Sequence, residues 1–237
     1  DVLAQQPRDL REFLLQTAVL RELDASACGA VSQTAHPRAL LARLVERDLL
    51  ISALGDEHYR YHHLFADFLR AQAERADAEA VCARHRRAAE HYQRVGNLDE
   101  EMYHWLAARA YDDAAARVQV IGENVLRAGR LDTLASWIDA LPGDTVAARP
   151  WLLFYLGDLA RLRSRFDDAL AWYAQAERAW RAANDVGGSA RALRGQALVY
   201  LDTVRPAQAE KLLEQALRLI DGVDDRAAKA RLLELLA

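Results

Sequence analysis

A small residue followed by three apolar residues at fixed offsets recurs three times in the second half of the chain. On two helices joined by a short turn, the small residue lets the helices approach closely and the larger side chains fill the space. The pattern therefore predicts a stack of helical hairpins that repeat roughly every 35 to 40 residues. The three sets are Gly122 with Leu134, Ile138 and Leu141; Gly157 with Ala169, Tyr173 and Ala176; and Ala197 with Ala209, Leu213 and Ala216.

Two short acidic phrases resemble the entry to the second helix of tetratricopeptide repeats. They are Phe166-Asp167-Asp168-Ala169 and Tyr111-Asp112-Asp113-Ala114. The repeat spacing departs from the strict ~34 residues of that family, so we expect degenerate repeats. Glycine and proline predict breaks between the helices at Gly96-Asn97, Gly129, Pro142-Gly143, Gly187-Gly188 and Gly222.

The first part of the chain predicts a different unit. Helical spacing follows Pro7, and a short helix is expected over 26–33. Another helix from near Pro37 carries Leu40, Leu41, Leu44 and Val45 on one face. Residues 50–54 are then β-prone, 55–57 form a turn, and 58–62 alternate aromatic and polar residues. This pattern predicts the chain's one β-hairpin, and a helix follows from about Leu64. The sequence thus predicts a mostly α protein, with a winged-helix-like domain at 1–76 and a helical solenoid at 77–237.

Composition excludes several classes of function. The only lysines are Lys211 and Lys229, and neither follows a glycine, so the sequence has no phosphate-binding P-loop. Two distant cysteines, Cys28 and Cys82, support no disulfide framework, which fits a reducing cytoplasm. No apolar run approaches the ~18 residues of a membrane span. The leucine-rich helical pattern at the end predicts that the chain is a fragment, with the solenoid truncated at its C-terminus.

The polar residues point to binding rather than to catalysis. His58, His62 and His63 cluster at the hairpin but lack a metal-ligand spacing, so we predict neither a metal nor a catalytic residue. Residues 1–76 hold nine arginines against eleven carboxylates, a net charge of −2, which disfavours DNA binding by the winged helix.

In tetratricopeptide geometry, the concave wall is formed by first-helix residues that face away from the second helix. Carried onto this sequence, such a wall combines aromatic faces with arginine forks, which suits a sugar, an anion or a peptide. The predicted groove residues are Trp151, Phe154, Asp158, Arg161, Arg191, Arg194, Glu123 and Arg127. For each of them the alternative is core packing or a solvated face.

Several motifs together resemble one protein family, the MalT-like, ATP-dependent LuxR-family transcriptional regulators. The most specific is Arg60-Tyr61-His62-His63-Leu64-Phe65-Ala66-Asp67-Phe68-Leu69-Arg70. Others are the opening run from Asp1 to Thr17, Leu44-x-x-Arg47-Asp48-Leu49-Leu50, the stretch from Gly96 to Leu106, and Trp137-Ile138-Asp139-Ala140-Leu141-Pro142. The resemblance covers essentially the whole chain and is strongest up to about residue 142.

The resemblance implies a regulatory role. In that family a signal-transducing ATPase precedes this region and a DNA-binding helix-turn-helix domain ends the protein. A winged-helix arm and a tetratricopeptide-like sensor lie between them. It implies a non-enzymatic fragment without a cofactor of its own, ATP or ADP in the parent protein, an inducer or regulatory protein as partner, and self-association on activation. DNA would be contacted only by a domain outside this chain.

One residue role follows from the resemblance. Related switch ATPases carry a histidine in a Met-His-Asp motif that contacts the phosphate of ADP, and His62 stands at the matching place. His63 replaces the aspartate of that motif, and the alternative for His62 is packing beneath the hairpin. Two other functions stay open for the chain: an adaptor that binds a protein partner, and a DNA-binding winged-helix protein with a helical dimerisation domain.

Overall fold

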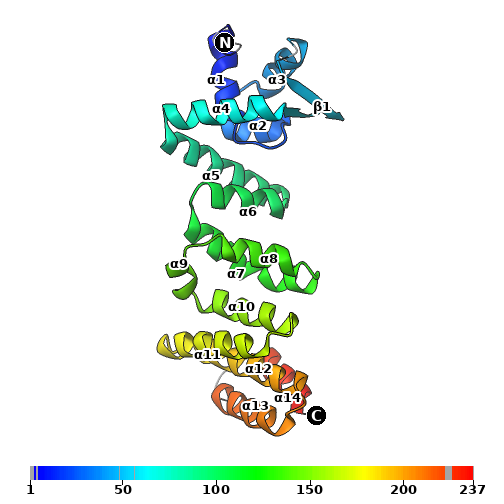
Figure 1. Cartoon of the computed structure of the whole chain (residues 1–237), viewed down its shortest axis with the longest axis vertical. Coiled ribbons are helices and arrows are strands. Elements are labelled where there is room, and N and C mark those ends of the chain that lie inside the picture. The colour runs from blue at the N-terminus through cyan, green and yellow to red at the C-terminus, as the bar shows by residue number, and fades with distance from the viewer. Residues whose placement is uncertain (1–2, 4, 48, 56, 222–225, 237) are drawn as a thin grey trace. The chain divides into compact units, whose positions relative to one another are not determined.

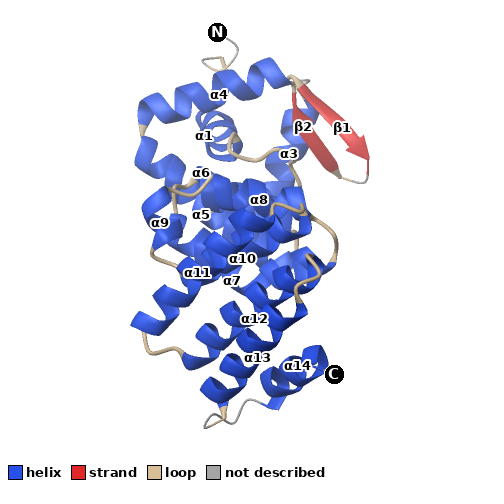
Figure 2. Ribbon diagram, turned by 60° about the horizontal axis from the view of Figure 1, so that its bottom comes forward, coloured by secondary structure: helices blue, strands red, loops and turns tan. Residues whose placement is uncertain are grey.

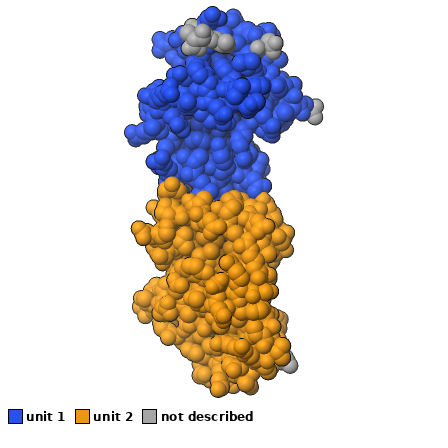
Figure 3. Space-filling view, in the orientation of Figure 1, with its two compact units in different colours: residues 1–110 blue, residues 111–237 orange. Residues whose placement is uncertain are grey.

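The computed structural model describes residues 3, 5–47, 49–55, 57–221 and 226–236. It divides into two compact units, residues 1–110 and 111–237, which Figure 3 shows in different colours. Each unit is helical apart from one small hairpin in the first, as Figures 1 and 2 show. The predicted class, mostly α with a single hairpin and a helical solenoid, is confirmed.

The first unit begins with a winged helix whose elements lie where the sequence predicts them. The core contains Leu10, Phe13, Leu44 and Leu69, all of which are almost completely buried. The elements are α1 (Arg8–Thr17), α2 (Ala25–Ser32), α3 (Pro37–Glu46), β1 (Ile51–Gly55), β2 (His58–Tyr61) and α4 (His63–Ala76). On α3, Leu41 and Leu44 are buried and Leu40 packs partly buried against the core, whereas Val45 is 41% exposed.

The hairpin is antiparallel, with Ile51 opposite Tyr61. Along β2 the alternation predicted from the sequence is present, since Tyr61 is buried and Tyr59 is half-buried between exposed neighbours. On its other side β2 pairs with Leu23 through two backbone hydrogen bonds, of 2.7 and 2.9 Å, at Tyr59. The Tyr61 hydroxyl lies 2.7 Å from the hydroxyl of Thr17, and this buried contact fixes the wing to α1.

Helices α5 (Ala78–Val95) and α6 (Leu98–Ala107) belong to the same compact unit. Helix α5 packs on α2, and Arg87 of α5 donates two hydrogen bonds, of 3.0 and 2.8 Å, to the carbonyl of Val31. Packing therefore joins this first helical hairpin to the winged helix. The domain boundary at residue 76 stays a prediction, because α5 begins directly after it and the contact division falls later.

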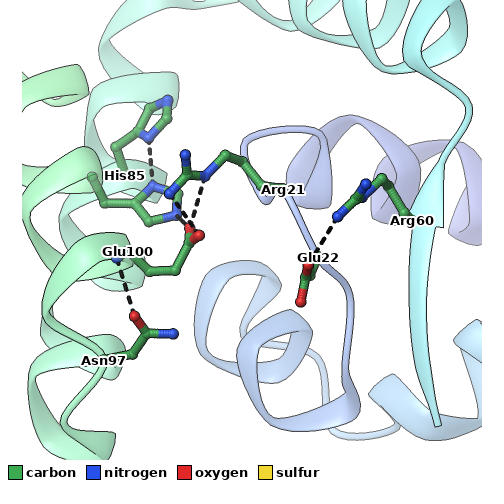
Figure 4. Close-up of polar contacts among 7 residues, drawn as sticks. Arg21, Glu22, Arg60, His85, Asn97 and Glu100 are labelled. Carbon is green, nitrogen blue, oxygen red and sulfur yellow. Dashed lines mark hydrogen bonds and ion pairs between the residues drawn. The ribbon is translucent and has the colours of Figure 1, made fainter. Parts of the chain in front are cut away.

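A buried pair of histidines fixes α5 to α6 (Figure 4). The Nδ1 atoms of His85 and His104 lie 2.8 Å apart, so one ring donates and the other accepts. His104 Nε2 lies 3.8 Å from the carboxylate of Glu100, which also binds the Arg21 guanidinium at 2.6 Å. We assign the Nε2 proton to His104, facing Glu100, and the Nδ1 proton to His85. The contact excludes two charged rings, because their N–H groups would oppose each other, and burial lowers the pKa of both histidines, so both rings are neutral at pH 7.

The second unit is a row of helices in which neighbours in sequence pack together. Helix α10 packs on α11, α11 on α12, and α12 on α13. The three apolar positions of each aligned set are all buried, as the repeat pattern predicts. The helices are α7 (Tyr111–Arg127), α8 (Leu131–Asp139), α9 (Gly143–Ala147), α10 (Pro150–Leu162), α11 (Phe166–Ala182), α12 (Val186–Asp202), α13 (Pro206–Ile220) and α14 (Arg226–Leu236).

One predicted break is wrong. Gly187 and Gly188 do not lie in the connection between two helices but in the first turn of α12. Asp185 caps this helix, because its side chain accepts a hydrogen bond of 2.7 Å from the N–H of Gly188. A Cβ added at Gly188 would lie 2.4 Å from the ring of Trp180, so only glycine permits this contact. The break at Gly222 lies outside the described residues. The turns at Gly96 and Gly129 have positive φ, as a helix-ending glycine requires.

The histidine pair predicts that acid weakens the first unit. Burial lowers the pKa of His85 to about 4 and that of His104 to about 2, while unfolded histidine titrates near 6.5. The stability that the neutral pair contributes is therefore complete above about pH 6.5 and is lost as the pH falls. At pH 5 we expect a loss of roughly 2 kcal/mol for each histidine.

Hydrogen exchange checks this prediction. Between pH 7 and pH 5, after correction for intrinsic rates, peptides from α5 and α6 should lose protection, whereas peptides from α11 and α12 should not. His104→Gln should flatten this pH response, and His58→Gln, a change on the exposed face of β2, should leave it intact. Equal protection of α5 and α6 at both pH values would contradict the assignment of two neutral histidines.

Candidate functional site

A pocket of about 250 Å³ opens in the second unit between residues of α7, α12 and α14. Its charged residues come from all three helices, and its apolar residues come from α12 and α14. The lining consists of Glu123, Gly187, Ala190, Arg191, Arg194, Ala228, Arg231 and Leu232.

The sequence of α12 explains how one helix serves both the core and the pocket. Gly187, Ala190, Arg191 and Arg194 follow helical spacing and therefore share one face, which lines the pocket. Gly188 and Gly195 lie on a different face and receive the aromatic rings of α11. Because Gly187 and Ala190 are small, they leave open the space that Arg191 and Arg194 line.

Arg191 is held by an aromatic ring. Its guanidinium lies 4.2 Å from the centre of the half-buried Trp151 ring on α10, which is a cation–π contact. Burial lowers the pKa of Arg191 and of Arg194, and the charge of Arg231 lowers both further. Arginine nevertheless stays protonated at any physiological pH, so all three guanidinium groups carry a full charge.

The pocket has an excess of positive charge. Its one lining carboxylate, Glu123, is hydrogen-bonded at 2.5 Å to Arg127, one turn further along α7. Among the ion pairs between described residues, none involves Arg191, Arg194 or Arg231. Three cations therefore face a cavity whose single acid already has another partner.

Asp158 lies behind the pocket on α10. The hydroxyl of Tyr173 donates a hydrogen bond of 2.6 Å to its carboxylate. Burial raises the pKa of Asp158 to about 6, and the positive charges of Arg161 and Arg194 oppose this rise. Asp158 thus stays ionised at neutral pH because tyrosine and arginine surround it.

The structure brings together part of the predicted groove. Glu123, Arg191 and Arg194 line the pocket, and Trp151 supports Arg191 from below. Phe154 does not line it: this ring is 4% exposed and packs against Trp151, Tyr173 and Trp180, because the close approach of α10 and α11 makes it part of the core. The remaining three do not line the pocket, and each is hydrogen-bonded to another side chain: Asp158 to Tyr173, Arg161 to Asp202, and Arg127 to the lining residue Glu123.

Sequence reasoning missed the apolar side of the pocket and one of its arginines. Gly187 was interpreted as part of a break, although its spacing with Ala190, Arg191 and Arg194 carries the signal of a shared helical face. Arg231, with Ala228 and Leu232, comes from α14 and has no counterpart in the aligned sets. The packing of α14 against α13 and α12 brings it to the pocket.

His62 lies at the surface of the first unit. It directly precedes α4, is exposed, and its ring centre is 4.4 Å from that of the equally exposed His63. The alternative that His62 packs beneath the hairpin is therefore wrong. In the part of the chain that the structure describes, no three histidine, cysteine or acidic side chains are grouped as a metal site would need. The same residues include no helix with the length and apolarity to cross a membrane.

Comparison with known proteins matches both halves of the chain. Residues 1–81 match the model of the MalT winged helix domain, and residues 148–221 match the model of the tetratricopeptide repeat. Neither model describes a catalytic domain.

Two kinds of curated relative align with nearly all of the chain. The serine/threonine-protein kinase PknK of Mycobacterium tuberculosis is 29% identical over 230 residues, which is 92% of this chain and 20% of the kinase. The HTH-type transcriptional regulator MalT of Cronobacter sakazakii is 27% identical over 227 residues, which is 93% of this chain and 25% of that regulator. The chain thus spans about a fifth to a quarter of the relatives that it matches. Residues 1–81 are thus similar to a MalT winged helix domain and residues 148–221 to tetratricopeptide repeats, as the resemblance to MalT-like regulators predicts.

Proposed function

We propose that this chain is the signal-receiving region of a larger cytoplasmic regulator and is not itself an enzyme. In this role, the repeats bind an inducer or a regulatory protein. The winged helix passes the signal to a nucleotide-dependent switch that precedes it, and a DNA-binding domain that follows carries the response. Self-association of the activated parent protein completes the proposal. The observation that carries it is the arginine-lined pocket on the repeat helices.

The two relatives support a role in receiving a signal rather than in producing the response to it. One is named as a kinase and the other as a transcriptional regulator, yet the same stretch of about 230 residues aligns with both. A region that accompanies two different outputs fits a shared input function. A ligand that binds one arrangement of the parent protein better than another shifts its population by that difference in affinity.

His62 supports the proposed link to the switch. Its exposed position before α4 leaves the imidazole available to a phosphate bound on a neighbouring domain. A histidine suits this contact because it can donate a hydrogen bond as a neutral ring and can also carry a charge.

The contacts of α3 do not favour DNA binding by the winged helix. Arg38 is paired with Glu57 at 2.8 Å, and Arg43 is paired with Asp9. These carboxylates occupy the arginines that a recognition helix would offer to phosphates. The scaffold alternative remains distinct, since a protein partner would cover the wall of the repeats instead of filling the pocket.

We expect His62→Ala in the full-length protein to release ADP faster and to raise basal transcription, because one phosphate contact is lost. A net loss of about 1 kcal/mol for such a hydrogen bond corresponds to roughly fivefold weaker ADP. The measurements are ADP dissociation and a promoter-reporter assay. His58→Ala, on the exposed face of the same hairpin, is the matched control, and unchanged ADP retention in the His62 variant would exclude the contact.

We expect Trp151→Ala combined with Arg191→Ala to abolish ligand-induced stabilisation of the chain. The first change removes the ring on which the Arg191 guanidinium lies, and the second removes that guanidinium. A thermal-shift screen with a metabolite panel identifies compounds that raise the Tm of the wild-type chain, and the same compounds are then tested on the variant. Trp172→Ala with Arg178→Ala on α11 is the control, because neither residue lines the pocket. A normal response of the Trp151 and Arg191 variant would argue against this site.

A further inference from the structure

The three pocket arginines need a counter-charge. Arg191 and Arg194 are half-buried, and their neighbours in the described structure leave them without an ion pair. Bringing like charges together in a partly dehydrated space is unfavourable, and an anion between them relieves that repulsion. The lowered pKa of both arginines has the same physical origin, burial and the charge of Arg231.

The size of the pocket limits its occupant. A volume of about 250 Å³ lies below the ~300–1,000 Å³ of typical drug-sized sites, so the pocket suits a compact metabolite. Gly187 has open space on the pocket side, where an added Cβ would meet only the Asp185 carboxylate at 3.6 Å. The helix backbone can therefore lie directly against the ligand.

The chemistry of the lining selects charge over hydroxyl groups. Gly187, Ala190, Ala228 and Leu232 offer no side-chain hydrogen bonds, and Glu123 is the one lining side chain that accepts them. A neutral sugar presents many hydroxyls that would need acceptors as well as donors. Guanidinium groups only donate, and they match the paired oxygens of carboxylate and phosphate.

The arginines are also held in place before binding. Arg191 lies on the Trp151 ring, which restricts its plane. The carboxylate of Asp158 attracts Arg194 from behind the pocket, and Tyr173 holds that carboxylate through its 2.6 Å hydrogen bond. Such preorganisation reduces the entropy lost when a ligand is bound. Arg231 is exposed on α14 and is the third arginine that lines the pocket.

We infer that the pocket between α7, α12 and α14 binds a small metabolite that carries at least two negative charges on carboxylate or phosphate groups. The inference rests on the proposed function and adds the chemical class of the ligand. Glu123 orients the ligand, because it keeps the anionic groups on the side of Arg194 and Arg231 and accepts from any hydroxyl near α7.

The test titrates the chain with inorganic phosphate, succinate and citrate, with trehalose as a neutral control, by thermal shift and calorimetry. At least one anion should raise the Tm, trehalose should not, and added NaCl should weaken binding. The preference among phosphate, succinate and citrate distinguishes a phosphorylated ligand from a di- or tricarboxylate. Stabilisation by trehalose alone, or by none of these compounds, would overturn the inference.

Variants separate this pocket from general anion binding. Arg231→Gln and Arg194→Gln should each weaken anion binding at least about tenfold, because each removes a charge-assisted hydrogen bond. Arg231→Lys should retain part of the affinity. Arg178→Gln, an exposed change on α11, should have no effect, and far-UV circular dichroism verifies the fold of each variant. An equal loss in the Arg178 and Arg231 variants would show that the anion binds elsewhere.

The outcomes for ligand class and for function are distinct. If anions bind this pocket but the full-length protein shows no change in activity, the proposed function fails and the ligand class stands. If the full-length protein responds to a neutral effector, and Arg194→Gln removes that response, the function stands and the ligand class is wrong.

Discussion

The packing of one tyrosine sets the geometry of the repeat region. Tyr173 of α11 is completely buried, and its ring fills the space that Gly157 of α10 and Gly195 of α12 leave open. A Cβ at either glycine would lie 2.6 Å from this ring, so the three helices can approach as they do only with glycine at both positions. Because α10 supplies Trp151 and α12 supplies both half-buried arginines, this packing fixes the back of the pocket.

Tyr173 also links the core to the charged residues of the pocket, through Asp158. Its hydroxyl satisfies Asp158, a carboxylate whose pKa burial raises, and Asp158 in turn faces Arg194. Loss of the tyrosine hydroxyl would leave a buried carboxylate without its hydrogen bond, a cost of about 1–3 kcal/mol. The contacts that stabilise the core of the second unit therefore also position an arginine of the proposed ligand pocket.

The sequence predicts the helices and strands more completely than it predicts the tertiary contacts between them. Alternation over 58–62 and fixed offsets after Gly122 and Gly157 report local geometry; β2 and the buried repeat positions confirm them. Gly188 was misread because a helix interior normally disfavours glycine by about 1 kcal/mol, whereas here close contact with Trp180 outweighs that preference. His85 shares a helix face with the buried Ala88 and Tyr92, but no sequence pattern shows that its ring meets His104 across a turn. The pocket was only partly predicted for the same reason, since α14 reaches it through tertiary packing.

The two units differ in whether their buried polar groups have partners within the protein. This difference bears on where a ligand could bind. In the first unit, neutral histidines satisfy each other, and Arg21 is matched by Glu100, so no charge awaits a partner in this network. In the second unit, three charged guanidinium groups face a cavity whose one lining carboxylate, Glu123, is hydrogen-bonded to Arg127. A ligand changes an equilibrium only through the difference in its affinity for two states. Under the proposal made above, unmatched charge gives an anion a large interaction with the folded repeats, whereas the contacts of Arg21 with Glu100 and of Arg87 with Val31 join the winged helix to its first helical hairpin.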